Sequence, residues 1–146
     1  MTAEEFLRQI KTYDTLIDCK CAELQSLYDL VTRITSTTDK EVVQTSGAND
    51  KVGMTVAKIV DLQNEINEVV DEYVDIKRHC ISVIEMLRDR PLRYSILHMH
   101  FVQYKGYTEI AAETNYSYKW IMDEKKAALR QVERIINSPG SFVREG

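Results

Sequence analysis

The stretch TEIAAETNYSYKWI, residues 108–121, has the pattern of two short helices joined by a tight turn. Asn115 tolerates the left-handed backbone conformation that such a turn requires, and the hydroxyl of Ser117 can cap the second helix. The helices need small or branched apolar residues where they cross, and these stand at Ile110, Ala111 and Ile121. The spacing therefore predicts a helix-turn-helix, a motif that proteins commonly use to bind DNA.

A further helix is expected before this motif. Pro91 fits the first turn of a helix, with Asp89 as its cap, and apolar residues continue to about residue 103. We expect helices over about 92–103, over 108–114 with Thr108 as the cap, and over 117–137. Residues 90–137 are thus predicted to form a three-helix unit, and residues 138–146 a flexible tail.

Residues 1–89 have a different pattern, in which apolar side chains recur at alternating spacings of three and four. One run extends from Phe6 to Ile34, and a second extends from Val52 through Val56 to Leu87. This periodicity predicts two long helices, each with a narrow apolar stripe. The segment between them, about residues 35–51, is rich in Ser, Thr, Asn, Asp and Gly and predicts a mobile loop. The simplest arrangement is an antiparallel helical hairpin, a coiled-coil-like arm.

The predicted fold is therefore all-α: a long antiparallel helical hairpin followed by a C-terminal three-helix unit that contains a helix-turn-helix. The second long helix has further apolar residues beside its stripe, at Val60, Val70, Val74 and Ile84. They indicate another contact, with the C-terminal unit or with a second chain. The pattern does not decide whether the arm pairs within one chain or between two.

Composition and charge narrow the class of protein. With 44% hydrophobic and 29% charged residues in 146, the chain is typical of soluble globular proteins. It contains neither a long apolar run nor a secretory signal pattern, so we expect a cytoplasmic protein without membrane contact. Residues 1–89 carry ten Lys and Arg against seventeen Asp and Glu, whereas residues 90–137 carry eight against five. The mildly basic C-terminal unit permits DNA binding but does not by itself indicate it.

No motif indicates catalysis, a cofactor or a bound metal. Cys19 and Cys21 lie two positions apart on a helix and point in nearly opposite directions, as do His98 and His100. The acidic residues of the second long helix lack the Glu-x-x-His repeats of a carboxylate metal site. We expect a protein that is not an enzyme, holds no cofactor or metal, and keeps its cysteines as free thiols.

Residues 92–129, LRYSILHMHFVQYKGYTEIAAETNYSYKWIMDEKKAAL, resemble region 4 of sigma-70-type factors. The arm contains KTYDTLIDCK at 11–20 and DKVGMTVAKIVDLQNEIN at 50–67. With these segments, residues 7–136 are similar to small phage-encoded, sigma-like transcription regulators, the group often labelled RinA- or ArpU-type. The resemblance implies a phage- or prophage-encoded regulator of late or packaging genes that binds promoter DNA in the bacterial cytoplasm.

The helix-turn-helix spacing and this resemblance together assign the DNA-facing residues to the last helix: Ser117, Tyr118, Lys119, Met122, Lys125, Lys126 and Arg130. Asp123 and Glu124 depart from the family, which has basic and branched apolar residues there. Asp123 would repel phosphate, and a buried Glu124 would be costly unless it is paired. Trp120 is expected as a core anchor rather than as a base-stacking residue.

Two functions remain open. The first is a transcription regulator that binds double-stranded promoter DNA as a dimer or with RNA polymerase, the second copy being held through the arm. The alternative is a non-catalytic protein-interaction module that keeps the helix-turn-helix fold but has lost DNA binding. Asp123, Glu124 and the absence of Arg at Ala127 favour this alternative. The cations of the last helix would then form an ordinary solvated face.

Overall fold

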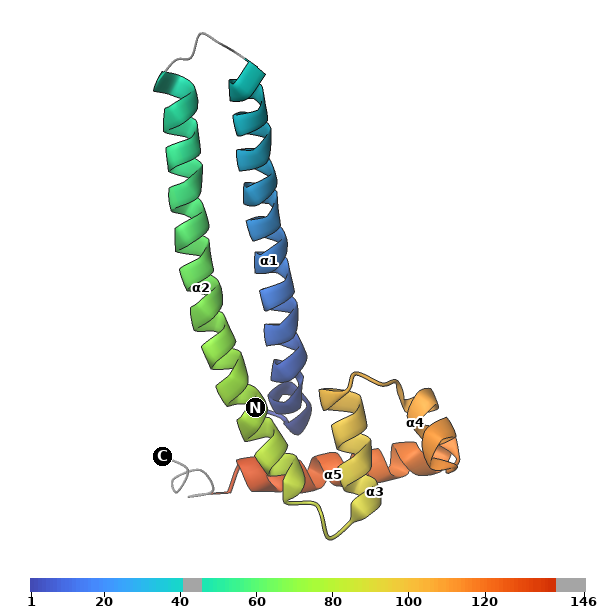
Figure 1. Cartoon of the computed structure of the whole chain (residues 1–146). Helices are drawn as coiled ribbons and strands as arrows, with labels where there is room; N and C mark the ends of the chain where they lie inside the picture. The colour runs from blue at the N-terminus through green and yellow to red at the C-terminus, as the bar shows by residue number, and fades with distance from the viewer. Residues whose placement is uncertain (41–45, 139–146) are drawn as a thin grey trace. The chain divides into compact units, whose positions relative to one another are not determined.

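The two apolar periodicities produce helices throughout the part of the chain that can be described. The computed structural model describes residues 1–40 and 46–138, with side chains for 1–36 and 50–138. All regular structure in these residues is helical, which confirms the all-α prediction (Figure 1). The helices are α1 (Ala3–Lys40), α2 (Ser46–Glu85), α3 (Pro91–Leu97), the π-helical turn η1 (His98–Val102), α4 (Tyr107–Thr114) and α5 (Tyr118–Ile136). None of the described helices is long and apolar enough to cross a bilayer.

The chain divides into two compact units. One contains residues 13–72 and is called the arm below; the other joins residues 1–12 to the chain from residue 73 onward and is called the C-terminal unit. This division differs from the expected boundary near residue 89, because the first residues of α1 and the last residues of α2 pack with the C-terminal helices and so belong to the C-terminal unit. The core of the C-terminal unit consists of Ala3, Phe6, Leu7, Ile10, Cys80, Val83, Ile84, Leu87, Leu97, Phe101, Ala128 and Val132, all buried.

Within the arm, α1 and α2 of the same chain lie side by side and antiparallel (Figure 1). The Nζ atom of Lys20 lies 2.9 Å from an Oε1 of Glu65, and Nε2 of Gln63 donates to the Tyr28 hydroxyl at 2.7 Å. Along the apolar seam between the helices, Ile59 and Leu62 are buried. The other seam residues are half-buried: Ile17, Leu24, Leu27, Val31, Ile66 and Val69.

The seam follows a register that the sequence pattern missed near the N-terminal end of α2. Thr55 is only 7% exposed, whereas the predicted stripe residue Val56 is 44% exposed. The hydroxyl of Thr55 donates to the Lys51 carbonyl oxygen at 2.8 Å, so its polar atom is satisfied within the helix. Val56 was therefore wrong as a stripe residue, because alternating spacing runs through Thr55 to Ile59.

The connection between the long helices is shorter than the loop expected at about residues 35–51. Helix α1 continues to Lys40, and α2 begins at Ser46. Threonines fit the end of α1 because their hydroxyls donate to carbonyl oxygens one turn back, from Thr32 to Tyr28 and from Thr35 to Val31. The rest of the predicted loop, residues 41–45, lies outside the described residues, as do residues 139–146 of the predicted tail.

The helix expected over residues 92–103 consists of α3 and a π-helical turn. In η1 the Gln103 N–H donates to the His98 carbonyl oxygen at 3.1 Å, five residues back. Tyr104 follows in the left-handed region with φ 62°. The N-cap of α3 is Arg90 without a side-chain hydrogen bond, so the assignment of Asp89 as cap was wrong. Pro91 occupies the first turn of α3, as predicted.

The core of the C-terminal unit can be tested at two adjacent residues. Leu87 is fully buried, whereas Met86 is 59% exposed. Leu87→Ala should lower the free energy of unfolding by about 2–5 kcal/mol, since it removes buried methyl groups and leaves a cavity. Met86→Ala should change it by less than about 0.5 kcal/mol. Denaturant unfolding followed by circular dichroism measures both; equal effects would contradict this core.

Candidate nucleic-acid interface

A small apolar cluster holds α4 and α5 against α3. Ile96, Ile110, Ala111 and Ile121 are buried together, with Leu92, Met99 and Tyr107 packed around them. The three residues that the sequence placed at the helix crossing, Ile110, Ala111 and Ile121, are all in this cluster. Their burial fixes the inner face of α5, and it leaves the opposite face of that helix at the surface.

The turn between α4 and α5 has the predicted chemistry. Asn115 adopts the left-handed conformation with φ 63° and ψ 26°. The Ser117 side chain caps α5 by accepting a hydrogen bond from the Trp120 N–H at 3.1 Å. Thr108 does not cap α4: the helix begins at Tyr107 after Gly106, and no side chain caps it. The predictions for Asn115 and Ser117 are confirmed, and the assignment of Thr108 was wrong because the helix begins one residue earlier.

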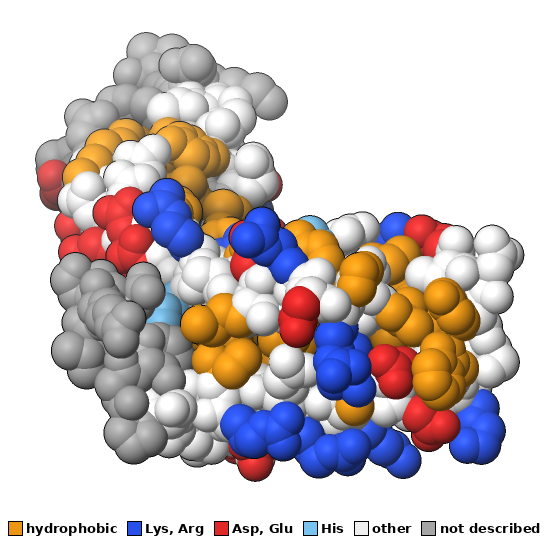
Figure 2. Space-filling view, turned by 90° about the horizontal axis from the view of Figure 1, so that it is seen from below, with side chains coloured by type: hydrophobic (Ala, Val, Ile, Leu, Met, Phe, Trp, Pro, Cys, Tyr) orange, Lys and Arg blue, Asp and Glu red, His pale blue; other side chains and the backbone are white. Residues whose placement is uncertain are grey.

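The outer face of α5 is partly cationic. Lys119, Asp123, Lys126 and Arg130 follow one another at spacings of four, three and four, so they form a single stripe, and all are exposed. The Nζ atom of Lys119 lies 3.1 Å from Oδ2 of Asp123. Their side chains are 85% and 47% exposed, so water screens this ion pair. Figure 2 shows that Lys and Arg side chains are interspersed with acidic ones on the face it presents.

Two of the predicted DNA-facing residues lie on a different side of α5. Met122 and Lys125 are half-buried, and the Lys125 Nζ atom lies 5.0 Å from the centroid of the Tyr107 ring. Tyr107 in turn stacks on His100 with ring centroids 4.1 Å apart and an interplanar angle of 17°. The ammonium of Lys125 is therefore held over an aromatic ring. Tyr118, Lys119, Lys126 and Arg130 are the exposed members of the predicted set; Ser117 is also exposed and acts as the cap.

Glu124 is turned away from this face. Its Oε1 atom accepts from Nε of Arg93 at 3.1 Å, and Nη1 of Arg93 also donates to Oε1 of Gln131 at 3.1 Å. The Arg93 and Glu124 side chains are 18% and 19% exposed. The carboxylate that would be costly if buried alone is thus paired with a helix α3 cation. Asp123 is the acid that stays on the outer face.

Trp120 was expected in the core but is 45% exposed. The neighbouring position Ile121 already fills the space between α3, α4 and α5, so the indole remains at the surface. Tyr116 and Tyr118 are exposed as well. The turn before α5 and the first residues of α5 therefore present three exposed aromatic side chains, of which the sequence had placed Tyr118 on the DNA-facing side and Trp120 in the core.

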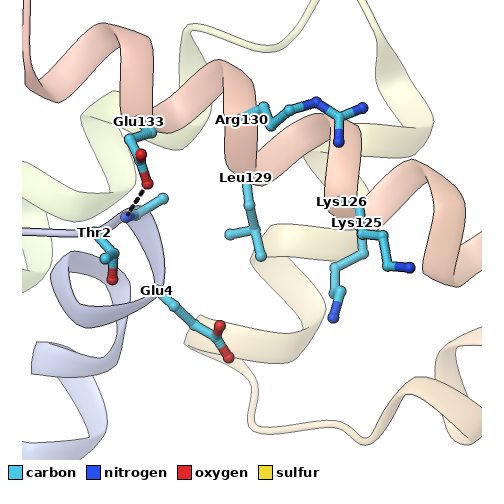
Figure 3. Close-up of a pocket in the computed structure, with 8 residues that line it drawn as sticks. Thr2, Glu4, Lys125, Lys126, Leu129, Arg130 and Glu133 are labelled. Carbon is cyan, nitrogen blue, oxygen red and sulfur yellow. Dashed lines mark hydrogen bonds between the residues drawn. The ribbon is translucent and has the colours of Figure 1, made fainter.

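A groove flanks the C-terminal half of α5, and one wall comes from the first turn of α1 (Figure 3). It has a volume of about 390 Å³ and is lined by Thr2, Ala3, Glu4, Lys125, Lys126, Leu129, Arg130 and Glu133. The Ala3 N–H donates to Oε1 of Glu133 at 3.2 Å. The spacing of residues in the sequence does not indicate that the first turn of α1 lies beside these cations. The segment TAEE carries a recognisable capping pattern, in which Thr2 and Glu5 exchange hydrogen bonds, but nothing in it indicates that α5 lies beside it.

The metal-ligating and thiol side chains of the described residues lie apart from one another. The described residues contain no group of three His, Cys, Asp or Glu side chains that could hold an ion. Cys80 is buried, its Sγ atom lies 3.4 Å from the Phe6 carbonyl oxygen, and burial raises the pKa of its thiol to about 12. Cys19 and Cys21 are free and exposed.

The Ser117 cap supports a stability prediction. Ser117→Ala should lower the free energy of unfolding by about 1 kcal/mol, because the Trp120 N–H loses its acceptor. Ser117→Asp should retain or slightly increase stability, since a carboxylate can accept the same bond at the positive end of the helix. Thermal unfolding of both variants beside the parent chain measures the effect. Equal losses for Ala and Asp would exclude capping by this side chain.

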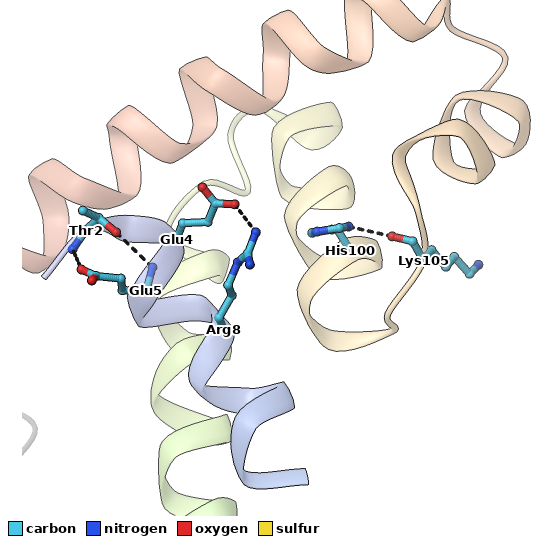
Figure 4. Close-up of polar contacts among 6 residues, drawn as sticks. All are labelled: Thr2, Glu4, Glu5, Arg8, His100 and Lys105. Carbon is cyan, nitrogen blue, oxygen red and sulfur yellow. Dashed lines mark hydrogen bonds and ion pairs between the residues drawn. The ribbon is translucent and has the colours of Figure 1, made fainter. Parts of the chain in front are cut away.

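His100 supports a prediction of pH dependence. Its Nδ1 atom donates to the Lys105 carbonyl oxygen at 2.7 Å (Figure 4), and burial, with Arg8 nearby, lowers its pKa below 6.5 despite this bond. The unfolded chain therefore takes up a proton more readily than the folded chain. The stability contributed by neutral His100 is present above about pH 6.5 and is lost as the pH falls through and below this value.

The measurement is the melting temperature at about pH 7.5 and about pH 5.5. The parent chain should lose more stability between these conditions than His100→Gln, which cannot titrate there. His79 and His98 are present in both proteins and serve as the internal control. An equal decrease in the two proteins would show that His100 does not couple folding to pH.

Comparisons with known proteins add no family to these observations. No protein-family model, no curated protein and no solved structure matches the chain.

Proposed function

We propose that the protein is a transcription regulator that binds promoter DNA through a helix-turn-helix formed by α4 and α5. The observation that carries this proposal is the outer face of α5. Its inner face is packed against α3 and α4, and its outer face presents Tyr118, Lys119, Lys126 and Arg130. A short helix, a left-handed residue and a capped second helix are the parts of a motif that places its second helix in the major groove.

The exposed residues have separate roles in this proposal. Tyr118 and Lys119 stand in the first turn of α5, the part of a recognition helix that reaches base edges or the nearest phosphates. Lys126 and Arg130 lie farther along the same stripe and would contact the phosphate backbone. Lys125 would contribute its charge from its position over Tyr107, without a close contact of its own.

A single copy offers few contacts for tight binding. Three exposed cations face the duplex, and Asp123 lies among them, so an isolated unit should bind weakly and with strong salt dependence. A second copy would double the contacts, and RNA polymerase would add contacts of its own. The resemblance to phage sigma-like regulators supports this mode of action in the bacterial cytoplasm.

A protein-interaction module is the second candidate. The exposed aromatic residues Tyr116, Tyr118 and Trp120 favour it, since Tyr and Trp are enriched at protein interfaces. Asp123 also favours it, because this carboxylate lies beside Lys119 and offsets part of the cationic stripe.

Titration of promoter DNA from the encoding genome across a salt series separates the candidates. Specific binding should weaken steeply with salt, and Lys126→Gln should lower the salt slope by about one unit. Lys125→Glu combined with Lys126→Glu should abolish binding. The absence of binding, alone and with polymerase, together with a stable complex with another protein, would support the interaction module.

The two acids provide a matched pair of variants for the same titration. Asp123→Asn should raise DNA affinity, because it removes a negative charge from the outer face of α5. Glu124→Gln should raise affinity less, because the Glu124 carboxylate lies beneath that face and is paired with Arg93. If both substitutions raised affinity equally, the DNA would not be approaching by the Asp123 stripe.

A further inference from the structure

On one side of the arm, the positions next to the seam carry no Lys, Arg, Asp or Glu over several helical turns. Asp29 lies at the outer edge of this side, where its Oδ1 atom accepts a hydrogen bond from Nε2 of Gln25 at 3.0 Å. On α2 this side contains the residues that immediately follow the seam positions, and on α1 it contains the corresponding flank. We call this face the uncharged strip: Val56, Val60, Gln63, Asn67 and Val70 of α2 with Cys21, Gln25, Tyr28 and Thr32 of α1. The hydrogen bond between Gln63 and Tyr28 shows that the two flanks meet on the same side. A groove that Cys21, Gln63 and Asn67 line together shows the same.

The opposite flank of α2 is acidic. The residues that immediately precede its seam positions are Lys58, Asp61, Glu65, Glu68 and Glu72. Glu65 is paired with Lys20 of α1, which leaves an excess of carboxylates on that side. Helix α2 of the arm therefore has one acidic flank and one uncharged flank.

We propose that a second copy of this chain packs against the uncharged strip, so that two arms form a four-helix bundle about a two-fold axis. In a two-fold interface each surface meets its own copy, and like charges repel each other there. The acidic flank cannot meet itself without this repulsion. The uncharged strip can, and a basic partner would be drawn to the acidic flank instead.

The exposure of the strip supports a contact of this kind. Val60 is 48%, Val56 44% and Tyr28 42% exposed, although all three lie next to the seam. The groove in the middle of the strip measures about 380 Å³, and the half-buried seam residues Leu24 and Ile66 form its floor. A side chain from a facing helix would fill this groove and would bury the valines beside it.

Near the C-terminal end of α2, the flank that follows the seam positions is covered by other helices of the C-terminal unit. Ile84 follows the seam residue Val83 as Val60 follows Ile59, and it is fully buried in the core of the C-terminal unit. In the arm no third helix of the same chain plays this part among the described residues. The second copy supplies it in our proposal.

The polar residues of the strip would set its register. Gln63 lies at the centre of the α2 part, so an axis there brings Val56 of one copy near Val70 of the other. Gln63 and Asn67 can exchange side-chain hydrogen bonds across the axis, as isolated polar residues do in coiled coils. Asp18, on the same flank of α1, marks the point at which charge returns and the contact ends.

This proposal rests on residues of the arm alone. The dimer it describes would provide the second copy that the proposed function uses. The test of this proposal contains no DNA, so its failure is distinct from the failure of DNA binding. The first measurement is sedimentation equilibrium of the full chain over a range of concentrations. We expect a monomer–dimer equilibrium without larger species.

Two substitutions to glutamate provide the matched comparison. Val60→Glu places a charge in the strip, and because it occurs twice in the dimer it should weaken association about a hundredfold. Ser26→Glu places the same charge on the other flank of α1 and should leave association unchanged within about threefold. Circular dichroism of both variants verifies that the helices are retained.

The exposed cysteines provide a second measurement that requires no substitution. Cys21 belongs to the uncharged strip, whereas Cys19, two positions earlier, lies on the opposite side of α1. Alkylation of Cys21 should become slower than that of Cys19 as the concentration enters the dimer range. At concentrations low enough for monomer the two rates should converge. Mass spectrometry of the digested chain measures each site separately.

Three results would overturn the proposal. A chain that stays monomeric at the highest attainable concentration has no second copy on the strip. A dimer that Val60→Glu and Ser26→Glu weaken equally uses another surface. A dimer in which Cys19 is protected and Cys21 is not would place the contact on the acidic side of the arm.

Discussion

The corner between α4 and α5 determines the direction of α5, and the contacts of the C-terminal unit follow from that direction. Asn115 turns the chain in a conformation that few residues tolerate, and Ser117 begins the next helix by satisfying one of its free N–H groups. Ile121 then falls into the space beside Ile110. One turn later Glu124 meets Arg93, and farther along Glu133 meets the first turn of α1. A change of direction at this corner would separate all these pairs.

The two sides of α5 differ in burial and in how strongly their charges are screened, and this difference bears on how the helix could bind a partner. Its inner side is held by apolar contacts and by one shielded ion pair, whereas its outer side has charges that water screens. The shielded Arg93–Glu124 pair helps to fix the position of α5 against α3. The charges on the outer side are screened by water and remain available to bind a partner. The acid next to Lys119 lowers the positive potential of the outer side without removing it. Weak, salt-sensitive association through this face agrees with such a surface.

Local features were predictable from the sequence, and remote contacts were not. The left-handed residue, the Ser117 cap and the buried crossing residues depend on neighbours a few positions away, and all three predictions are confirmed. The placement of Trp120 failed because Ile121 fills the core site that could have taken either side chain. The pairing of Glu124 with Arg93 could not be predicted, because it depends on how α3 lies against α5. The alternating spacing of three and four residues is compatible with Thr55 as a seam residue. Val56 was predicted instead because it is more hydrophobic than Thr55.

The π-helical turn at His98–Val102 directly follows α3, and its hydrogen bond from Gln103 to His98 spans one residue more than those of an α-helix. It ends this helix, because the chain bends at Gln103 and enters the left-handed region at Tyr104. Phe101 of this turn is buried in the core of the C-terminal unit, while His100 beside it stacks on Tyr107, so adjacent residues of the turn serve two different contacts. Length at this point is therefore under tighter constraint than composition. Among natural variants of this chain, conservative exchanges in the turn should be tolerated more readily than the loss of one residue.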